Sequence, residues 1–229
     1  MRDRVRLREE ACPVRVPAGS LTLDGDMCIP RGAQGIVIFA HGSGSSRLSP
    51  RNRYVAQVIR DSGLATLLFD LLTAQEEVED SRTARLRFDT GLLAKRLIQA
   101  TDWVRQNKET RNLKIGYFGA STGAAAALIA AVELPDVIGA VVSRGGRPDL
   151  AGTALPRVSA PTLLIVGGRD FPVIVLNREA LGQLNAEKKL VIVPGATHLF
   201  EEPGALEEVA EMAADWFVNH LTHKAVQKP

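Results

Sequence analysis

The stretch Leu113-Lys-Ile-Gly-Tyr-Phe-Gly119-Ala120-Ser121-Thr122-Gly123-Ala124 decides the fold. Its apolar run, Ile115 to Phe118, predicts a strand that is buried on both faces. The segment that follows, Ala124 to Ala131, is small and apolar all round and predicts a tightly packed helix. A Gly-x-Ser-x-Gly pattern joins the two. In such a sharp strand-to-helix turn the serine adopts strained dihedral angles and its hydroxyl stands above the sheet. Glycine two residues before and two residues after the serine removes a clash between side chains.

The same alternation of strand and helix extends in both directions from this turn. Further apolar runs predict buried strands at residues 36–40, 65–69, 137–142, 162–166 and 190–193. Between them, apolar residues recur at helical spacing at 54–59, 93–104 and 206–217. This order predicts an α/β fold, with a mostly parallel sheet and helices on both faces. Alternating residues from Cys12 to Pro30 predict an antiparallel hairpin at the amino-terminal edge. We expect one domain over residues 1–229 and no large lid, since the connection from Ser143 to Ala160 is short.

Composition narrows the class of protein. The 229 residues are 45% hydrophobic and 24% charged, which excludes a disordered or collagen-like chain. The 28 basic and 26 acidic residues nearly cancel, so no nucleic-acid partner is expected. Two cysteines, Cys12 and Cys28, are too few for a disulfide scaffold or a cysteine zinc cluster. No apolar run approaches the length of a membrane span, and Met1–Glu10 lacks the apolar core of a signal peptide. We therefore expect a cytoplasmic protein without a membrane partner.

A serine hydroxyl needs a base, and in this type of fold the acid and then the histidine follow the serine along the chain. His198 follows the last predicted strand, at the sheet edge where open α/β sheets place their sites. His220 and His223 lie at the end of the last helix and in a polar tail. Asp170 directly follows the strand at 162–166 and is the predicted acid, with Asp149 in reserve. The other acids considered are Glu133, Asp136, Glu179 and Glu187.

Two backbone amides are candidates for stabilising a tetrahedral oxyanion. One is the amide of Thr122, directly after the nucleophile, and we expect the other to be that of Ser43. Ser43 lies in the loop His41-Gly-Ser-Gly-Ser-Ser46, which follows a predicted strand. This loop does not match a nucleotide-phosphate motif, because it lacks Gly-x-Gly-x-x-Gly and no Gly-Lys-Ser/Thr follows it. We expect His41 to brace the loop.

With these four motifs in order, the chain resembles the α/β hydrolases, and among them the small lidless dienelactone-hydrolase-like group. The resemblance runs from about Leu21 to about Leu221. It implies a mostly parallel sheet of about eight strands with the site at its carboxyl edge. Dienelactone hydrolase itself has a cysteine nucleophile, whereas this chain has Ser121. Similar modules are also found joined to phosphoribosyltransferase domains.

These residues favour a serine hydrolase, a carboxylesterase that cleaves small soluble esters through an acyl-enzyme on Ser121, His198 and Asp170. Neither a metal nor an organic cofactor is expected, and the expected partner is a small-molecule ester. Two alternatives stay open. The same triad could serve acyl transfer, perhydrolysis or amide cleavage, or the chain could be a non-catalytic binding protein on the hydrolase fold.

Arginines near the expected site are candidates for binding a substrate carboxylate. Arg144 follows a predicted strand end, and Arg147, Arg82 and Arg85 are further candidates. The alternative for Arg144 is a surface position or a pair with Asp149. The charged segment at residues 71–91, which holds Arg82 and Arg85, is expected to be a solvated loop or helix face.

Overall fold

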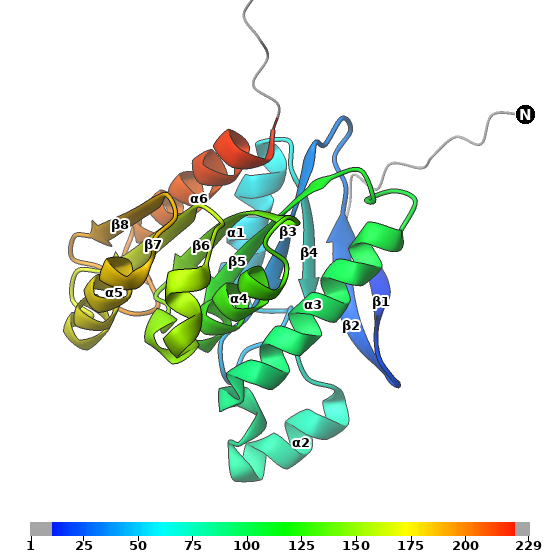
Figure 1. The fold of residues 1–229 in the computed structure, drawn as a ribbon, viewed down its shortest axis with the longest axis horizontal. Coiled ribbons are helices and arrows are strands. Elements are labelled where there is room, and N and C mark those ends of the chain that lie inside the picture. The colour runs from blue at the N-terminus through cyan, green and yellow to red at the C-terminus, as the bar shows by residue number, and fades with distance from the viewer. Residues whose placement is uncertain (1–10, 223–229) are drawn as a thin grey trace, which may run out of the picture.

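The computed structural model describes residues 11–222, so the expectations about Met1–Glu10 and His223 lie outside the described residues. One eight-stranded sheet forms the centre of the molecule (Figure 1). The strands are β1 (Cys12–Ala18), β2 (Leu21–Cys28), β3 (Gly35–Ala40), β4 (Ala65–Phe69), β5 (Lys114–Ala120), β6 (Ile138–Arg144), β7 (Thr162–Gly167) and β8 (Lys188–Val193). The helices are α1 (Pro50–Asp61), α2 (Ala74–Thr83), α3 (Thr90–Gln106), α4 (Thr122–Glu133), α5 (Phe171–Gln183) and α6 (Ala205–Leu221), with 3-10 helices η1 (Leu86–Phe88) and η2 (Pro148–Arg157).

The strand order is β1-β2-β4-β3-β5-β6-β7-β8. The first strand pairs antiparallel with β2, and β2 pairs antiparallel with β4. All pairings from β4 to β8 are parallel. This confirms the predicted fold class: a mostly parallel sheet with an antiparallel hairpin at one edge. Because the strands β3 to β8 run in one direction, their carboxyl ends lie at one edge of the sheet, and that edge carries the loops discussed below.

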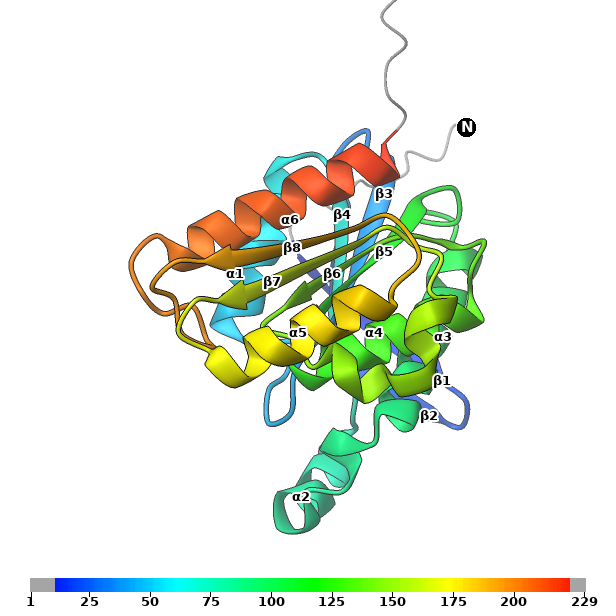
Figure 2. The same cartoon turned by 60° about the vertical axis from the view of Figure 1, so that its left-hand side comes forward.

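Helices cover both faces of the sheet, as Figure 2 shows. On one face, α1 and α6 bury a cluster that includes Val55, Ile59 and Phe217. On the other face, α3 and α4 bury a larger cluster that includes Leu97 and Leu128. Nearly every residue of α4 is buried, and most of them are alanine. Small side chains let this helix approach the sheet closely, which sets the position of its first residue against the end of β5.

The last turn of α6 rests on glycines of three neighbouring strands. A Cβ atom placed on Gly35 of β3, Gly116 of β5 or Gly139 of β6 would lie 2.7 to 2.9 Å from a side-chain atom of Leu221. Only glycine leaves room for this side chain, which is fully buried. The carboxyl end of α6 is therefore fixed against the amino-terminal part of the parallel strands.

The charged segment at residues 71–91 contains α2 and η1, and α2 projects from the body of the molecule (Figures 1 and 2). A capping box starts this helix, since the Thr73 hydroxyl accepts from the Glu76 amide and the Glu76 carboxylate accepts from the Thr73 amide. Most of its residues are exposed or half-buried, but Asp80 is fully buried. The segment thus contains the solvated helix face that the sequence predicts. Asp80 is the exception, because the charge pattern gave no sign that this acid is buried.

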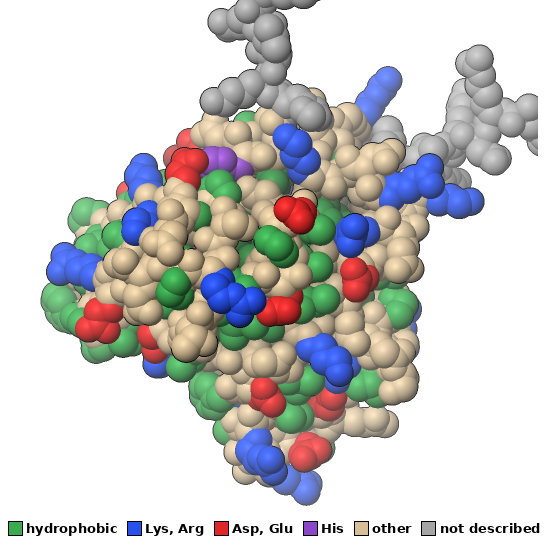
Figure 3. Space-filling view, in the orientation of Figure 1, with side chains coloured by type: hydrophobic (Ala, Val, Ile, Leu, Met, Phe, Trp, Pro, Cys, Tyr) green, Lys and Arg blue, Asp and Glu red, His purple; other side chains and the backbone are tan. Residues whose placement is uncertain are grey.

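Acidic and basic side chains are interspersed on the face of the molecule seen in Figure 3. This mixture agrees with the small net charge of +2, and no continuous basic patch covers that face. Among residues 11–222, no helix has both the length and the apolar composition needed to cross a bilayer.

Candidate active site

Ser121 lies between β5 and α4 in a backbone conformation that few side chains adopt. Its φ is 50° and its ψ is −122°, and among residues 11–222 only Ala84 and Phe200 are other non-glycine residues with positive φ. A residue held in such a region costs about 1–3 kcal/mol, which the surrounding structure must offset. The turn is the strained strand-to-helix connection that the sequence predicts.

The two glycines of the motif are required by close backbone contacts. A Cβ on Gly119 would lie 2.5 Å from Ala124 Cα, and a Cβ on Gly123 would lie 2.2 Å from the carbonyl oxygen of Ala40. Gly42, in the loop after β3, also lies against the serine, because its Cβ would be 2.9 Å from Ser121 Cβ. The end of β3 and the turn at Ser121 therefore touch at atoms that leave no space for a side chain.

His198 and Asp170 are joined by a hydrogen bond. His198 Nδ1 lies 2.6 Å from Asp170 Oδ2, and the side chains are 38% and 13% exposed. Asp170 occupies the N-cap position of α5, but its carboxylate makes no capping bond to that helix. An aspartate at this position ordinarily caps the helix, so its use by His198 removes a local stabilising contact. With Nδ1 directed at the carboxylate, Nε2 is the ring nitrogen left for a reacting group.

The loop that carries His198 is fixed at several points. The Thr197 amide donates to Glu202 Oε2 at 3.0 Å, and the Arg169 amide donates to the Ala196 carbonyl at 2.9 Å. A Cβ on Gly167, at the end of β7, would lie 2.4 Å from the Thr197 carbonyl oxygen. The histidine loop and the aspartate loop are thus packed against each other backbone to backbone.

Ser121 and His198 both approach the end of β6. The Ser121 amide donates to the Arg144 carbonyl at 3.3 Å. Gly145 has a φ of 50°, and a Cβ there would lie 3.0 Å from the His198 carbonyl oxygen and 3.6 Å from His198 Cε1. The turn at Ser121 and the loop with His198, which are far apart along the chain, therefore meet at two consecutive residues, Arg144 and Gly145.

Two other residues considered from the sequence, Asp149 and His220, have partners elsewhere. Asp149, the reserve acid, accepts two hydrogen bonds from Arg147, at 2.9 and 2.7 Å. The hydrogen bond to Asp149 raises the pKa of Arg147. His220 lies 3.6 Å from Glu187 and packs on Trp216. The side chains of Asp149 and His220 are thus each paired with a residue other than His198 or Ser121.

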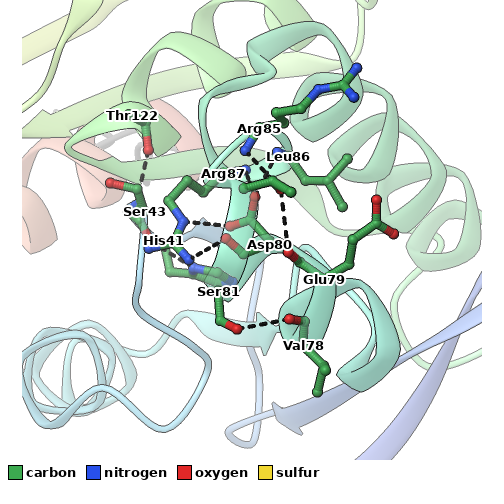
Figure 4. A network of polar contacts seen from close by, with 12 residues as sticks. His41, Ser43, Val78, Glu79, Asp80, Ser81, Arg85, Leu86, Arg87 and Thr122 are labelled. Carbon is green, nitrogen blue, oxygen red and sulfur yellow. Dashed lines mark hydrogen bonds and ion pairs between the residues drawn. The ribbon is translucent and has the colours of Figure 1, made fainter.

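The loop with Ser43 and the first residue of α4, Thr122, are in contact. The Ser43 amide donates to Thr122 Oγ1 at 3.0 Å, a contact drawn in Figure 4. An oxygen atom thus already occupies the acceptor position of the Ser43 amide. A substrate oxygen could take that position once the Thr122 hydroxyl rotates away.

His41 braces the loop after β3. Its Nδ1 lies 3.0 Å from the Gly42 carbonyl oxygen, and its Nε2 accepts from the Leu71 amide at 3.0 Å. A backbone amide can only donate, so Nε2 is unprotonated and Nδ1 carries the hydrogen. Burial lowers the pKa of His41, while the Gly42 carbonyl and Asp70 oppose the shift. The ring is neutral and has both nitrogens occupied.

This arrangement predicts a pH dependence of stability. Because the folded pKa of His41 lies below its unfolded value, the unfolded chain binds more protons as pH falls below about 6.5. Stability should then fall as the pH is lowered through this range. The His41→Gln protein, whose side chain can accept from the Leu71 amide without titrating, should lose less stability between about pH 7.5 and about pH 5. Urea unfolding of both proteins at the two pH values measures this. Equal losses in the two proteins would contradict it.

The sequence analysis did not identify Arg87 as a residue near the site. Arg87 lies in η1, close to the loop with Ser43 (Figure 4). It forms an ion pair with the buried carboxylate of Asp80, which also accepts from the Leu86 amide at 2.7 Å. Burial opposes ionisation of Asp80, but these hydrogen bonds outweigh it and hold the pKa of Asp80 below its ordinary value. A Cβ on Gly44 would lie 3.7 Å from Arg87 Nη1. The two arginines first considered in this segment, Arg82 and Arg85, are exposed.

Arg144 occupies neither of the two alternative positions, a place on the surface or a pair with Asp149. It is 7% exposed, so it is not a surface residue, and Asp149 is paired with Arg147 instead. Its Nε and Nη1 are buried and have no hydrogen-bond partner among the described residues. Burial, together with the charge of Arg51, lowers the pKa of Arg144 to about 10.

Known proteins match this chain over most of its length. The model of the dienelactone hydrolase family matches residues 23–223. A dienelactone hydrolase structure from Anabaena variabilis is 62% identical, with a TM-score of 0.92, and the match covers 93% of this chain and 99% of that one. Est1E from Butyrivibrio proteoclasticus is 16% identical with a TM-score of 0.76, over 91% of this chain and 98% of its own, and this likeness is one of fold alone.

Two sequences from Mycobacterium tuberculosis strains are each 56% identical over 215 residues, and both are provisionally named phosphoribosyl transferases. The match covers 94% of this chain but 47% of each relative, so the chain spans about half the length of these proteins. The Anabaena structure, in contrast, is covered over 99% of its own chain, and the family model matches residues 23–223 of this one. The chain therefore belongs to the dienelactone hydrolase family and has the fold of a hydrolase.

Proposed function

We propose that this protein is a serine carboxylesterase that cleaves small esters through an acyl-enzyme on Ser121. The observation that carries this proposal is the 2.6 Å hydrogen bond between His198 and Asp170, on loops that meet the nucleophile turn at the end of β6. A histidine oriented by a carboxylate and a serine at a strained turn are the parts that acyl transfer to serine needs.

The reaction follows from the positions of these groups. Ser121 Oγ attacks the ester carbonyl and His198 Nε2 takes its proton, while Asp170 stabilises the imidazolium through Nδ1–H. The carbonyl oxygen becomes an oxyanion that accepts from the Ser43 and Thr122 amides. When the C–O bond breaks, the alcohol leaves with the proton from His198. A water that gives its proton to His198 then attacks the acyl-enzyme, which releases the acid and restores Ser121.

The expected substrates are small. The connection after β6 holds only the ten-residue η2, so it supplies no separate lid over the site. Activity should therefore not rise at a lipid–water interface. The alternative acyl acceptors, an amine, peroxide or second alcohol, need the same groups, and no residue described above favours one of them over water.

We do not propose a phosphoribosyl transferase activity for this chain, although the mycobacterial relatives carry that name. The name belongs to proteins about twice as long as the matched region, and the matched region is the one with the serine turn.

Covalent labelling tests the proposal directly. A fluorophosphonate probe should add one equivalent to the protein, and peptide mass analysis should place it on the peptide with Ser121. The Ser121→Ala protein should take no label, whereas the Ser43→Ala protein should be labelled like the wild type, since the amide of residue 43 and not its side chain is proposed to act. p-Nitrophenyl acetate should be hydrolysed with saturation and with release of one acyl group per turnover. Label on another residue, or no label with no turnover, would remove the serine-hydrolase proposal and favour a binding protein.

A further inference from the structure

The loop at residues 41–46, which carries the Ser43 amide, has few contacts of its own to fix its shape. Glycine precedes and follows Ser43, and Gly44 has a positive φ of 69°. Glycine has wide backbone freedom, so a fixed conformation of this loop costs conformational entropy that contacts must offset. Within the loop, the Ser45 amide donates to the Gly42 carbonyl at 3.2 Å. The loop therefore depends on contacts with other segments.

One of these contacts is lost when a substrate binds as proposed. The Ser43 amide donates to Thr122 Oγ1 at 3.0 Å, and the oxyanion would take the place of that acceptor. His41 holds the start of the loop, because its Nε2 accepts from the Leu71 amide. Gly44, beyond Ser43, lies in the wall of a cavity of about 1070 Å³ and is uncovered there. During the reaction, this second half of the loop needs a support other than Thr122.

Arg87 supplies a contact to this second half of the loop. A Cβ placed on Gly44 would lie 3.7 Å from Arg87 Nη1, which is an ordinary van der Waals distance. A second, small cavity of about 10 Å³ has Ser43, Gly44 and Arg87 in its wall. A space of this size holds no more than about one water molecule. The loop therefore has almost no room to move toward η1 while Arg87 is in place.

Asp80 determines where the guanidinium group of Arg87 lies. Its carboxylate, which is 1% exposed, forms an ion pair with Arg87 Nε, and its carbonyl oxygen accepts from Arg87 Nη2 at 3.0 Å. The carboxylate also accepts from the amides of Leu86 and Arg87, at 2.7 and 3.2 Å, which fixes the backbone of η1. With Nε and Nη2 engaged, Nη1 is the nitrogen that lies against the loop (Figure 4). Lysine could not replace this arrangement, because it lacks the rigid fork of donors.

We propose that Arg87 is a positioning residue, which holds the loop at residues 41–46 so that the Ser43 amide faces the oxyanion, and that Asp80 acts through Arg87. The effect on catalysis rests on the proposed ester hydrolysis, whereas the support of the loop stands without it. Arg87 does not need to touch the substrate. When the oxyanion replaces Thr122 Oγ1 as the acceptor, Arg87 keeps the Ser43 amide in place. The oxyanion forms only during the reaction, so a displaced amide slows the chemical step more than it weakens substrate binding.

Hydrogen–deuterium exchange, measured by mass spectrometry, tests the support of the loop without any turnover. The main variant is the double substitution Arg87→Met with Asp80→Asn, because it leaves no buried carboxylate without its ion pair. Peptides that cover residues 41–46 should exchange roughly threefold faster or more in this variant, whereas peptides from β5 should exchange as in the wild type. The matched control is Arg85→Met, an exposed arginine two residues away, which should exchange like the wild type. Unchanged exchange of the loop in the double variant would overturn the proposal.

Ester kinetics test the effect on catalysis. In the double variant, kcat and kcat/KM for p-nitrophenyl acetate should both fall roughly 10- to 100-fold, less than the factor of about 10²–10³ for complete loss of an oxyanion donor. KM should stay within about threefold, because the lost interaction is made in the transition state. Each kcat is calculated per serine that a fluorophosphonate labels, so unfolded protein does not contribute. A normal kcat for the labelled fraction, with less protein labelled, would show that the pair only stabilises the fold and would overturn the positioning role.

The single variants show whether Asp80 acts through Arg87. Asp80→Asn, Arg87→Met and the double variant should have the same kcat within about threefold, because residues that act as one unit are not additive. Multiplying effects of the two substitutions, or full activity of Arg87→Lys, would contradict the proposed geometry. A loosened loop in a protein without esterase activity would refute the proposed function and leave the support of the loop standing. Ester turnover that is equal in the wild type and all variants would refute the role of Arg87 and leave the proposed function standing.

Discussion

The Asp170→Asn protein is expected to hydrolyse p-nitrophenyl acetate with a kcat about 10⁴-fold below that of the wild type. The amide can donate to Nδ1 and so favours the histidine tautomer with its hydrogen on Nε2, which cannot take the proton of Ser121. The amide also lacks the charge that stabilises the imidazolium. Since Asp170 makes no capping bond to α5, the substitution should change the melting temperature little. Steady-state kinetics and thermal unfolding of the purified protein measure the two effects.

The matched control for this prediction is Asp149→Asn. Asp149 is also a carboxylate just beyond the end of a strand, but its partner is Arg147. Its replacement should leave kcat within about threefold of the wild type, because a half-exposed ion pair contributes at most about 1 kcal/mol. If Asp149→Asn were the inactive variant and Asp170→Asn the active one, the assignment of the acid would be wrong.

The second large effect is expected on stability, from Gly123→Ala. The added methyl group would lie 2.2 Å from the Ala40 carbonyl oxygen and 2.6 Å from that of His41, and both are backbone atoms that cannot move separately. We expect a loss of about 3 kcal/mol or more, at the upper end of the range for overpacked cores. For a chain of this size, that lowers the melting temperature by roughly 6–12 °C.

Gly182 provides the control for this substitution. It lies within α5, its φ is not positive, and no atom lies within 4 Å of a Cβ placed there. Gly182→Ala should therefore leave the melting temperature unchanged or raise it slightly, since alanine is the better helix former. Equal melting temperatures for the Gly123 and Gly182 variants would mean that the backbone contact at β3 relaxes without cost.

The strands and the nucleophile turn could be predicted because their signals are local. Buried parallel strands are continuous apolar runs. Gly119 and Gly123 mark the turn, because a side chain at either position would clash with neighbouring backbone atoms. Asp170 and His198 could be selected because each directly follows a strand whose carboxyl end lies at the site edge. Asp170 was preferred to Asp149 because it comes directly after a strand, and in the structure Asp149 is paired with Arg147.

Other features depend on contacts that no local pattern reveals. Helix α2 is polar on every side, so it has no apolar stripe, although Thr73 and Glu76 form a capping box that could have marked its start. Helix α5 was not expected, although Pro172 in its first turn is a typical start signal. The burial of Arg144 and of Asp80 follows from segments that pack on them from elsewhere in the chain. Charged residues in a sequence are expected at the surface, and only the assembled fold shows the exceptions.

The packing of α6 on the three strand glycines determines where a support or a second protein can be attached to this domain. Leu221 is held at Gly35, Gly116 and Gly139, toward the amino ends of the parallel strands, while Ser121 lies past their carboxyl ends. A tether attached just after α6 would leave from the side of the molecule opposite the substrate entrance. Immobilising the protein on a resin, or fusing a second catalytic unit behind it, should therefore leave the path to the serine open.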